Sequence, residues 1–188
     1  MGNNAQNVST GKPNPAGGVW VAPLNTTLPT DATSQLDGAF KCLGYVSDAG
    51  VENANDLNVS VIKAWGGNIV YRSLTELNDT FKFALIESEN IDALKSVYGD
   101  DNVTVTAGGD IKIDVVAEDP EELVWVIELK LRGDRAKRII IKDGAVTARD
   151  SIKYTDGDPI AYGITVSAYP DSSGKTHYEF IEGDGGSH

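Results

Sequence analysis

The chain has 188 residues, 28 acidic against 16 basic side chains, a formal net charge of −12, and one cysteine. Cys42 alone excludes an intramolecular disulfide framework and a thiolate zinc site. The acidic balance argues against a chain that grips DNA phosphates or anionic lipid. There is no apolar run of about 18 residues and no secretory signal pattern. The sequence therefore predicts a product kept in a cytosol-like compartment, with no membrane partner.

Residues 1–30 have the composition of an extended arm. They hold four of the seven prolines and one charge, Lys12. Within them Val19, Trp20 and Val21 form an apolar island that is too short to fold alone. Two interpretations stay open: the island packs on its own domain, or it docks on a neighbouring subunit.

From Phe40 onward the pattern has period two, which is typical of strands with one wet face. In the fourth predicted strand Phe81, Phe83 and Leu85 share a face, whereas the strand over 123–131 is apolar on both faces and is expected to be covered by another segment. Asp143-Gly144 predicts a hairpin turn. The predicted strands are 41–47, 57–65, 68–75, 79–87, 103–107, 111–117, 123–131, 136–142, 145–154, 160–169 and 176–182.

One helix interrupts the strands. Ser88 or Asn90 is expected to cap it, and Gly99 to end it. Its apolar stripe is Ile91, Leu94, Val97 and Tyr98. One helix among at least nine strands predicts a mainly β fold, an antiparallel β-sandwich or barrel with one flanking α-helix. The expected division is an extended N-terminal arm (1–30), a β-sandwich domain (31–182) and a flexible tail (183–188).

No motif supports catalysis, a cofactor or a metal. The string Ser173-Gly174-Lys175-Thr176 copies the end of a phosphate-binding loop, but a strand rather than a helix is expected to follow it. His177 lies in a predicted strand, His188 is terminal, and neither has an evident nucleophile beside it. The sequence therefore predicts a protein that is not an enzyme.

The segment 130–142 is strongly basic, with six basic residues and one acid. We expect such a segment on an acidic chain to meet acidic surface on another copy, although a solvated hairpin tip explains it equally well. Within it Arg132-Gly133-Asp134 is interpreted as turn chemistry. Together with the apolar island, the candidate subunit-interface residues are Val19, Trp20, Val21, Lys130, Arg132, Arg135, Lys137 and Arg138.

Three strings carry a family resemblance: IKAWGGNIV (62–70), TFKFALIES (80–88) and ENIDALKSVYGDDNV (89–103). Their residue pattern resembles that of the major tail tube proteins of long-tailed bacteriophages, most strongly over 40–105. The resemblance implies a β-sandwich or barrel with one flanking helix, whose subunits form hexameric rings that stack into a hollow tube.

The resemblance also implies partners and a location. The chain would associate with itself, with a tape measure protein and with a tail terminator, in a virion tail assembled in the host bacterial cytoplasm. DNA would pass through the lumen to be ejected, and an acidic lining would repel phosphate so that DNA slides without specific binding. The alternative from another functional class is a virion decoration or receptor-binding β-domain.

Overall fold

The structure is a computed structural model that describes residues 2–183. It is mainly β, and it has one α-helix among the described residues, α1 (Ile91–Tyr98). The 3-10 turns are η1 (Ala5–Asn7), η2 (Asp100–Asn102) and η3 (Arg132–Asp134). The strands are β1 (Lys12–Pro13), β2 (Val19–Pro23), β3 (Lys41–Cys42), β4 (Glu52–Lys63), β5 (Ile69–Leu85), β6 (Val103–Val105), β7 (Ile111–Ile113), β8 (Glu122–Lys130), β9 (Ala136–Arg149), β10 (Tyr162–Ala168) and β11 (Tyr178–Ile181). The predicted fold class is confirmed. Of the expected tail, all but Gly183 lies outside the described residues.

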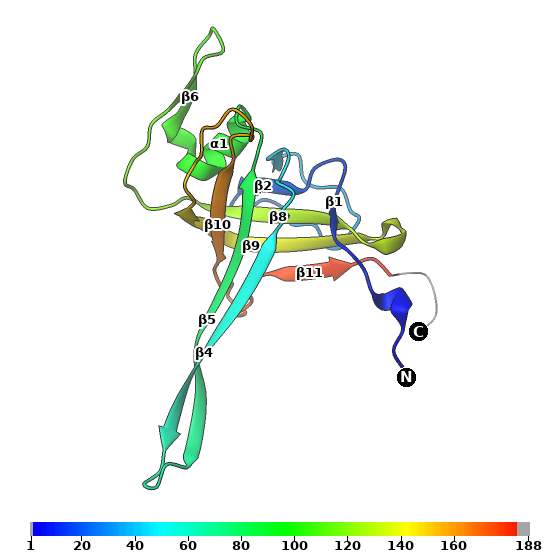
Figure 1. Cartoon of the computed structure of the whole chain (residues 1–188), viewed down its shortest axis with the longest axis vertical. Coiled ribbons are helices and arrows are strands. Elements are labelled where there is room, and N and C mark those ends of the chain that lie inside the picture. Colours follow the sequence, from blue (N-terminus) through cyan, green and yellow to red (C-terminus); the bar gives the residue numbers. More distant parts are fainter. Residues whose placement is uncertain (1, 184–188) are drawn as a thin grey trace.

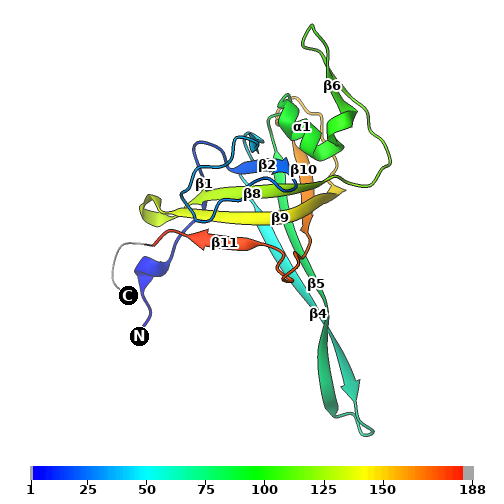
Figure 2. The same cartoon turned by 180° about the vertical axis from the view of Figure 1, so that it is seen from behind.

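One antiparallel sheet makes up the body of the molecule, in the order β3-β2-β8-β9-β10-β5-β4. The long strand β9 has two partners on one edge, because its first half pairs with β11 and its second half with β10. At this change of partner the sheet folds over, so that β10, β5 and β4 cross the layer formed by β2, β8 and β9 (Figures 1 and 2). A separate two-stranded sheet, β6-β7, projects beyond α1.

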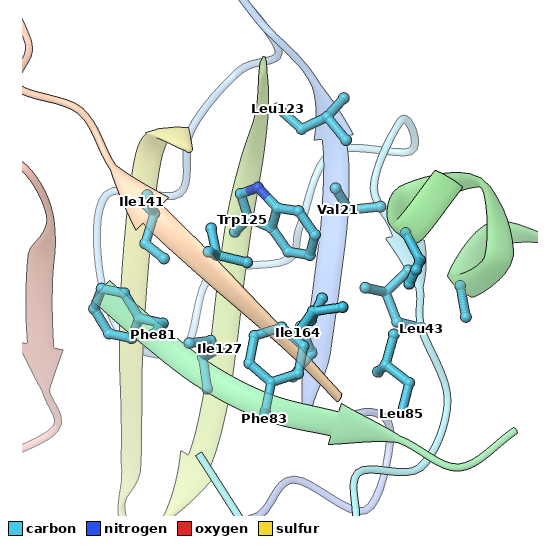
Figure 3. Packing of buried hydrophobic residues seen from close by; sticks show 14 of the residues in the cluster. Val21, Leu43, Phe81, Phe83, Leu85, Leu123, Trp125, Ile127, Ile141 and Ile164 are labelled. Carbon is cyan, nitrogen blue, oxygen red and sulfur yellow. The ribbon is translucent and has the colours of Figure 1, made fainter. Parts of the chain in front are cut away.

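The main core fills the space between the two layers (Figure 3). Trp125 of β8 lies at its centre with 1% of its surface exposed, and its indole N–H donates to the Gly144 carbonyl at 2.9 Å. The predicted inward face of β5 is confirmed, because Phe81, Phe83 and Leu85 are all buried here. Helix α1 closes one end of the core with Ala93 and Val97.

A second apolar cluster covers the opposite face of β8 and β9. Val124, Val126 and Ile140 point into it, and the segment between β2 and β3 supplies its cover. The covering side chains are Leu24, Leu28, Leu36 and Phe40. The expectation that the 123–131 strand is buried on both faces is therefore confirmed.

Helix α1 has the predicted ends. The Asn90 side-chain oxygen accepts hydrogen bonds from the N–H groups of Asp92 and Ala93, at 3.1 and 3.2 Å, so Asn90 rather than Ser88 is the cap. Gly99 ends the helix at φ 99°, and its N–H donates to the Lys95 carbonyl at 2.8 Å.

The predicted strand 41–47 is mostly wrong, because β3 ends at Cys42. Gly44 turns the chain at φ 79° and leaves room for the Glu87 carboxylate. A Cβ at this position would lie 2.1 Å from that carboxylate, which accepts from the N–H of Tyr45 at 2.9 Å. Beyond this turn only one isolated bridge, Val46 to Leu85, joins the segment to β5.

The expected turn at Asp143-Gly144 is also wrong, since β9 runs unbroken through both residues. Here the glycine provides close approach instead of a turn. A Cβ on Gly144 would lie 2.9 Å from Ile141 and 3.1 Å from both Trp125 and Val166. The neighbouring β8 shifts register between Leu123 and Trp125, opposite this point.

Candidate assembly surface

The long hairpin of β4 and β5 is the feature that projects furthest from the body (Figures 1 and 2). The sequence predicts two strands, at 68–75 and 79–87, but β5 is a single strand of 17 residues. Its C-terminal part pairs with β10 as far as Asp79 and belongs to the folded sheet. From Leu77 outward, β5 pairs with β4 alone, so this distal half is a two-stranded ribbon.

The root of the hairpin is fixed by a buried carboxylate. The Asp79 side chain accepts from the Asn53 amide at 2.8 Å and from the Thr176 hydroxyl at 2.6 Å, and it contacts His177 Nδ1 at 2.5 Å. The His177 ring also packs edge-on against Phe81, with ring centroids 5.2 Å apart. These contacts tie β4, β5 and the approach to β11 together where the hairpin leaves the sheet.

The strand register gives the hairpin one apolar and one polar face. Residues directly opposite each other share a face, and Leu57 pairs with Leu77 while Val59 pairs with Leu74. A register shift leaves Thr75 as an extra residue, whose hydroxyl donates to the Asn58 carbonyl at 2.9 Å. Without this extra residue Leu74 and Leu77 would lie on opposite faces.

The apolar face continues the core face of β5 but has no cover within the described chain. Its apolar side chains are Leu57, Val59, Val61, Leu74 and Leu77, which are between 39% and 62% exposed, and Arg72 lies opposite Val61 at its distal end. The opposite face carries Asn58, Ser60, Ser73 and Glu76, and toward the tip it also carries the exposed pair Ile62 and Tyr71. Burying each apolar side chain the rest of the way would be worth about 1 kcal/mol. A ribbon of this kind is typical of a surface that becomes buried on association.

Two of the candidate interface residues from the arm are buried in the chain itself. Val19 and Val21 lie in the main core, because β2 pairs with β8 inside the sheet. Trp20 is half-buried on the other face, and its indole N–H donates to the Gly17 carbonyl at 3.2 Å. The apolar island therefore packs on its own domain. Its contact with a neighbouring subunit stays a prediction.

The fold divides the basic segment into members that pair with a carboxylate and members that do not. Lys137 is 3.0 Å from the Glu179 carboxylate, and Arg138 is buried. The turn η3 brings together Lys130, Arg132 and Arg135. Within residues 2–183, the side chains of these three residues donate hydrogen bonds to backbone carbonyls. These last three residues are the part of the segment that can meet another copy.

Arg138 organises the segment that covers the second cluster. Its guanidinium lies 2.5 Å from the buried Glu128 carboxylate and donates to the carbonyls of Asp31 and Ser34, both at 2.8 Å. Asn14 of the arm donates to the second carboxylate oxygen of Glu128 at 2.9 Å. The pair therefore holds the 31–34 turn and the arm against the sheet.

Nothing in the described residues has the form of a metal centre, since no group of three or more His, Cys, Asp or Glu side chains is placed to hold an ion. No helix within residues 2–183 is long and apolar enough to cross a membrane.

The hairpin is not predicted from the sequence as an assembly surface, because its alternating pattern is interpreted as strands whose apolar face packs on their own core. The sequence does contain one signal of this surface. Residues 57–77 include more alternating positions than a single core can cover.

Replacing Arg138 by alanine is expected to lower the free energy of unfolding of the subunit by about 3–5 kcal/mol, because Glu128 is left buried without its partner. Arg132→Ala is the matched control: its side chain is exposed, and the expected change is below about 0.5 kcal/mol. Urea unfolding of both variants measures the difference. Equal stability of the two variants would contradict the role given to Arg138.

Comparison with known proteins identifies the family of this mainly β subunit. A search of curated proteins gave no match. A family model described as phage tail tube protein matches residues 1–187, essentially the whole chain. That family is structural rather than enzymatic, and the antiparallel β fold with one α-helix is consistent with it. The chain therefore belongs to the phage tail tube protein family and is a structural component of the virion tail.

Proposed function

We propose that the protein assembles in the host cytoplasm into stacked hexameric rings, which form the conduit for DNA ejection into the host. The observation that carries this proposal is the uncovered apolar face of the β4-β5 hairpin. The tape measure protein inside the tube and a terminator at its end are the further partners that this role requires.

Lateral contact between subunits is supported by the open edge of the sheet. Strand β4 is its last strand, with 12 residues and no partner on the outer side among residues 2–183. A long uncovered edge offers backbone N–H and C=O groups to a strand of another chain. The apolar face beside it continues the core, so a neighbouring subunit that covers this face extends the core from one subunit to the next.

The polar face of the same hairpin is our proposed lining of the lumen. It carries Glu52, Asp56 and Glu76 against one base, Lys82, which lies 3.0 Å from Asp150. The lining is therefore acidic near the body, whereas Ile62 and Tyr71 lie on the same face toward the tip. Such a surface repels DNA phosphates and lets DNA pass without specific binding.

The basic cluster of exposed Arg132 with half-buried Lys130 and Arg135 is proposed as a contact with acidic surface on another copy. The chain as a whole is strongly acidic, so carboxylates are abundant on any neighbour. This cluster is what remains of the basic segment once Lys137, Arg138 and Lys142 are paired within the subunit. Exposed charge pairs of this kind set orientation and association rate more than affinity.

Leu74→Asp is expected to prevent tube growth, because it places a charge at the centre of the apolar face. Ser73→Asp is the matched control on the next residue, and it should leave growth intact because Ser73 lies on the polar face. Both variants should unfold at the wild-type temperature, since the distal hairpin lies outside the core. Electron microscopy of the purified protein at high concentration, with sedimentation, measures assembly. Normal tubes from Leu74→Asp would remove the apolar face from the mechanism.

Acids on the proposed lumen face can be tested by charge reversal. Virions carrying Asp56→Lys and Glu76→Lys are expected to eject DNA more slowly or to stall, because the lysines attract phosphate. The charge-matched control is Asp156→Lys with Asp158→Lys, in the exposed loop before β10. Ejection is followed by dye binding to released DNA. Unchanged kinetics in the first variant would count against an acidic lining by this face.

Arg132→Glu is expected to raise the protein concentration needed for tube growth and to weaken its dependence on salt, because an attractive contact between copies becomes repulsive. Lys153→Glu, in an exposed loop, makes the same change of charge elsewhere. Light scattering at several salt concentrations compares the two variants. If both respond equally, net charge rather than the basic cluster governs assembly.

A further inference from the structure

The tip of the β4-β5 hairpin presents a tryptophan entirely to solvent. The turn between the strands closes with the Ala64 N–H donating to the Asn68 carbonyl at 2.8 Å, and Gly66 and Gly67 have φ of 106° and 93°. Trp65 in this turn has a relative exposure of 106%, so no described part of the chain covers its ring. Tryptophan is enriched among the few residues that supply most of the binding energy of protein interfaces.

A groove with an apolar wall lies between helix α1 and the β2-β3 edge of the sheet. Its volume is about 490 Å³, which is large enough to receive an indole ring. Val21, Ala22, Pro23, Ala39 and Leu123 form the apolar wall. Asp92, Asp100 and Glu121 stand on its rim with Lys41 and Lys95, and Lys95 is 2.7 Å from Asp100.

The charges of the tip and of the groove are complementary. The distal hairpin, residues 59–75, carries Lys63 and Arg72 and no acid. The groove and the hollow that adjoins it share Asp100 and Glu121, and their walls together hold six carboxylates against three bases. The hairpin tip, which is basic and carries Trp65, is therefore complementary to a groove that has an apolar wall and nearby carboxylates.

The hairpin tip lies far below the body, whereas α1 and β2, which border the groove, lie in its upper part in both views, so a subunit cannot fill its own groove (Figures 1 and 2). We infer that Trp65 of one copy inserts into the groove between α1 and β2-β3 of another copy, with Lys63 facing the groove's carboxylates. This contact joins two different surfaces, and such a contact repeats from copy to copy. The inference rests on the proposed tube assembly and names one of its contacts.

A smaller groove around Cys42 and the 13–18 segment is a poorer match. Its volume is about 280 Å³, and Glu87 is the acid that lines it. That carboxylate already accepts from the Tyr45 N–H at 2.9 Å and from the Asn90 amide at 3.0 Å. It therefore accepts two hydrogen bonds within the chain, whereas Glu121 accepts one long bond, from the Asp100 N–H at 3.4 Å, and no ion pair is seen for Asp92 or Glu121 within the described residues.

Trp65→Ala is expected to raise the critical concentration for tube growth at least tenfold, while Tyr154→Ala, which removes another exposed aromatic ring, leaves it within twofold. Filling the groove with Ala39→Trp should have the same effect as Trp65→Ala, and Ala16→Trp in the smaller groove should have none. Lys63→Glu and Glu121→Lys should each impair growth, and the double variant should recover it. Sedimentation and electron microscopy of the full chain provide the readout, and circular dichroism confirms folding.

The contact is also tested directly by crosslinking. In a Cys42→Ser background, Ala64→Cys with Ala39→Cys should give disulfide-linked oligomers, and Ala64→Cys with Ala16→Cys should not. Wild-type tubes together with normal growth of Trp65→Ala would overturn this inference and leave the proposed function standing. A wild-type chain that stays monomeric at all concentrations would overturn the proposed function. In that case the absence of the Ala64–Ala39 crosslink at high concentration would overturn the contact as well.

Discussion

The continuity of β5 is the constraint on which the rest of the structure depends. One unbroken strand supplies Phe81 and Phe83 to the core and Leu74 and Leu77 to the projecting hairpin. Because side chains alternate along a strand, the face that is buried in the body continues outside it, and in this sequence that continuation is mostly apolar. The extra residue at Thr75 restores the alternation where the strand would otherwise turn Leu74 to the wrong side. A single subunit therefore folds with part of its apolar face left for another molecule.

Features with local causes could be predicted from the sequence, whereas features that depend on distant partners could not. The cap at Asn90 and the stop at Gly99 use atoms within a few residues of the helix, so the pattern was sufficient. Gly144 shows the opposite case. An Asp-Gly pair usually marks a turn, but here Trp125 and Val166, both far away in sequence, require a residue without a side chain.

The candidate interface shows the same division. Sequence alone counted Arg138 among six basic residues of one segment, and the count was right. It did not show that Glu128 lies opposite Arg138 on the next strand, where the two are buried as a pair. Local charge therefore identified the segment as basic. The register of β8 and β9 is needed to show that Arg138 is paired within the subunit, unlike the cluster at η3. The hairpin was missed for a related reason: a pattern of alternation specifies a strand and its two faces, but not which molecule covers the apolar one.

The charge of −12 bears on how such a subunit stays soluble before it assembles. Repulsion between strongly acidic copies opposes random contact through their uncovered apolar surface. The distal hairpin is an exception to the acidic surface, because residues 59–75 carry two bases and no acid. Copies therefore repel each other least in the orientations that bring this hairpin against acidic surface. The acidic surface therefore keeps subunits apart and also favours the proposed contact through the distal hairpin. Solubility and directed assembly follow from one distribution of charge.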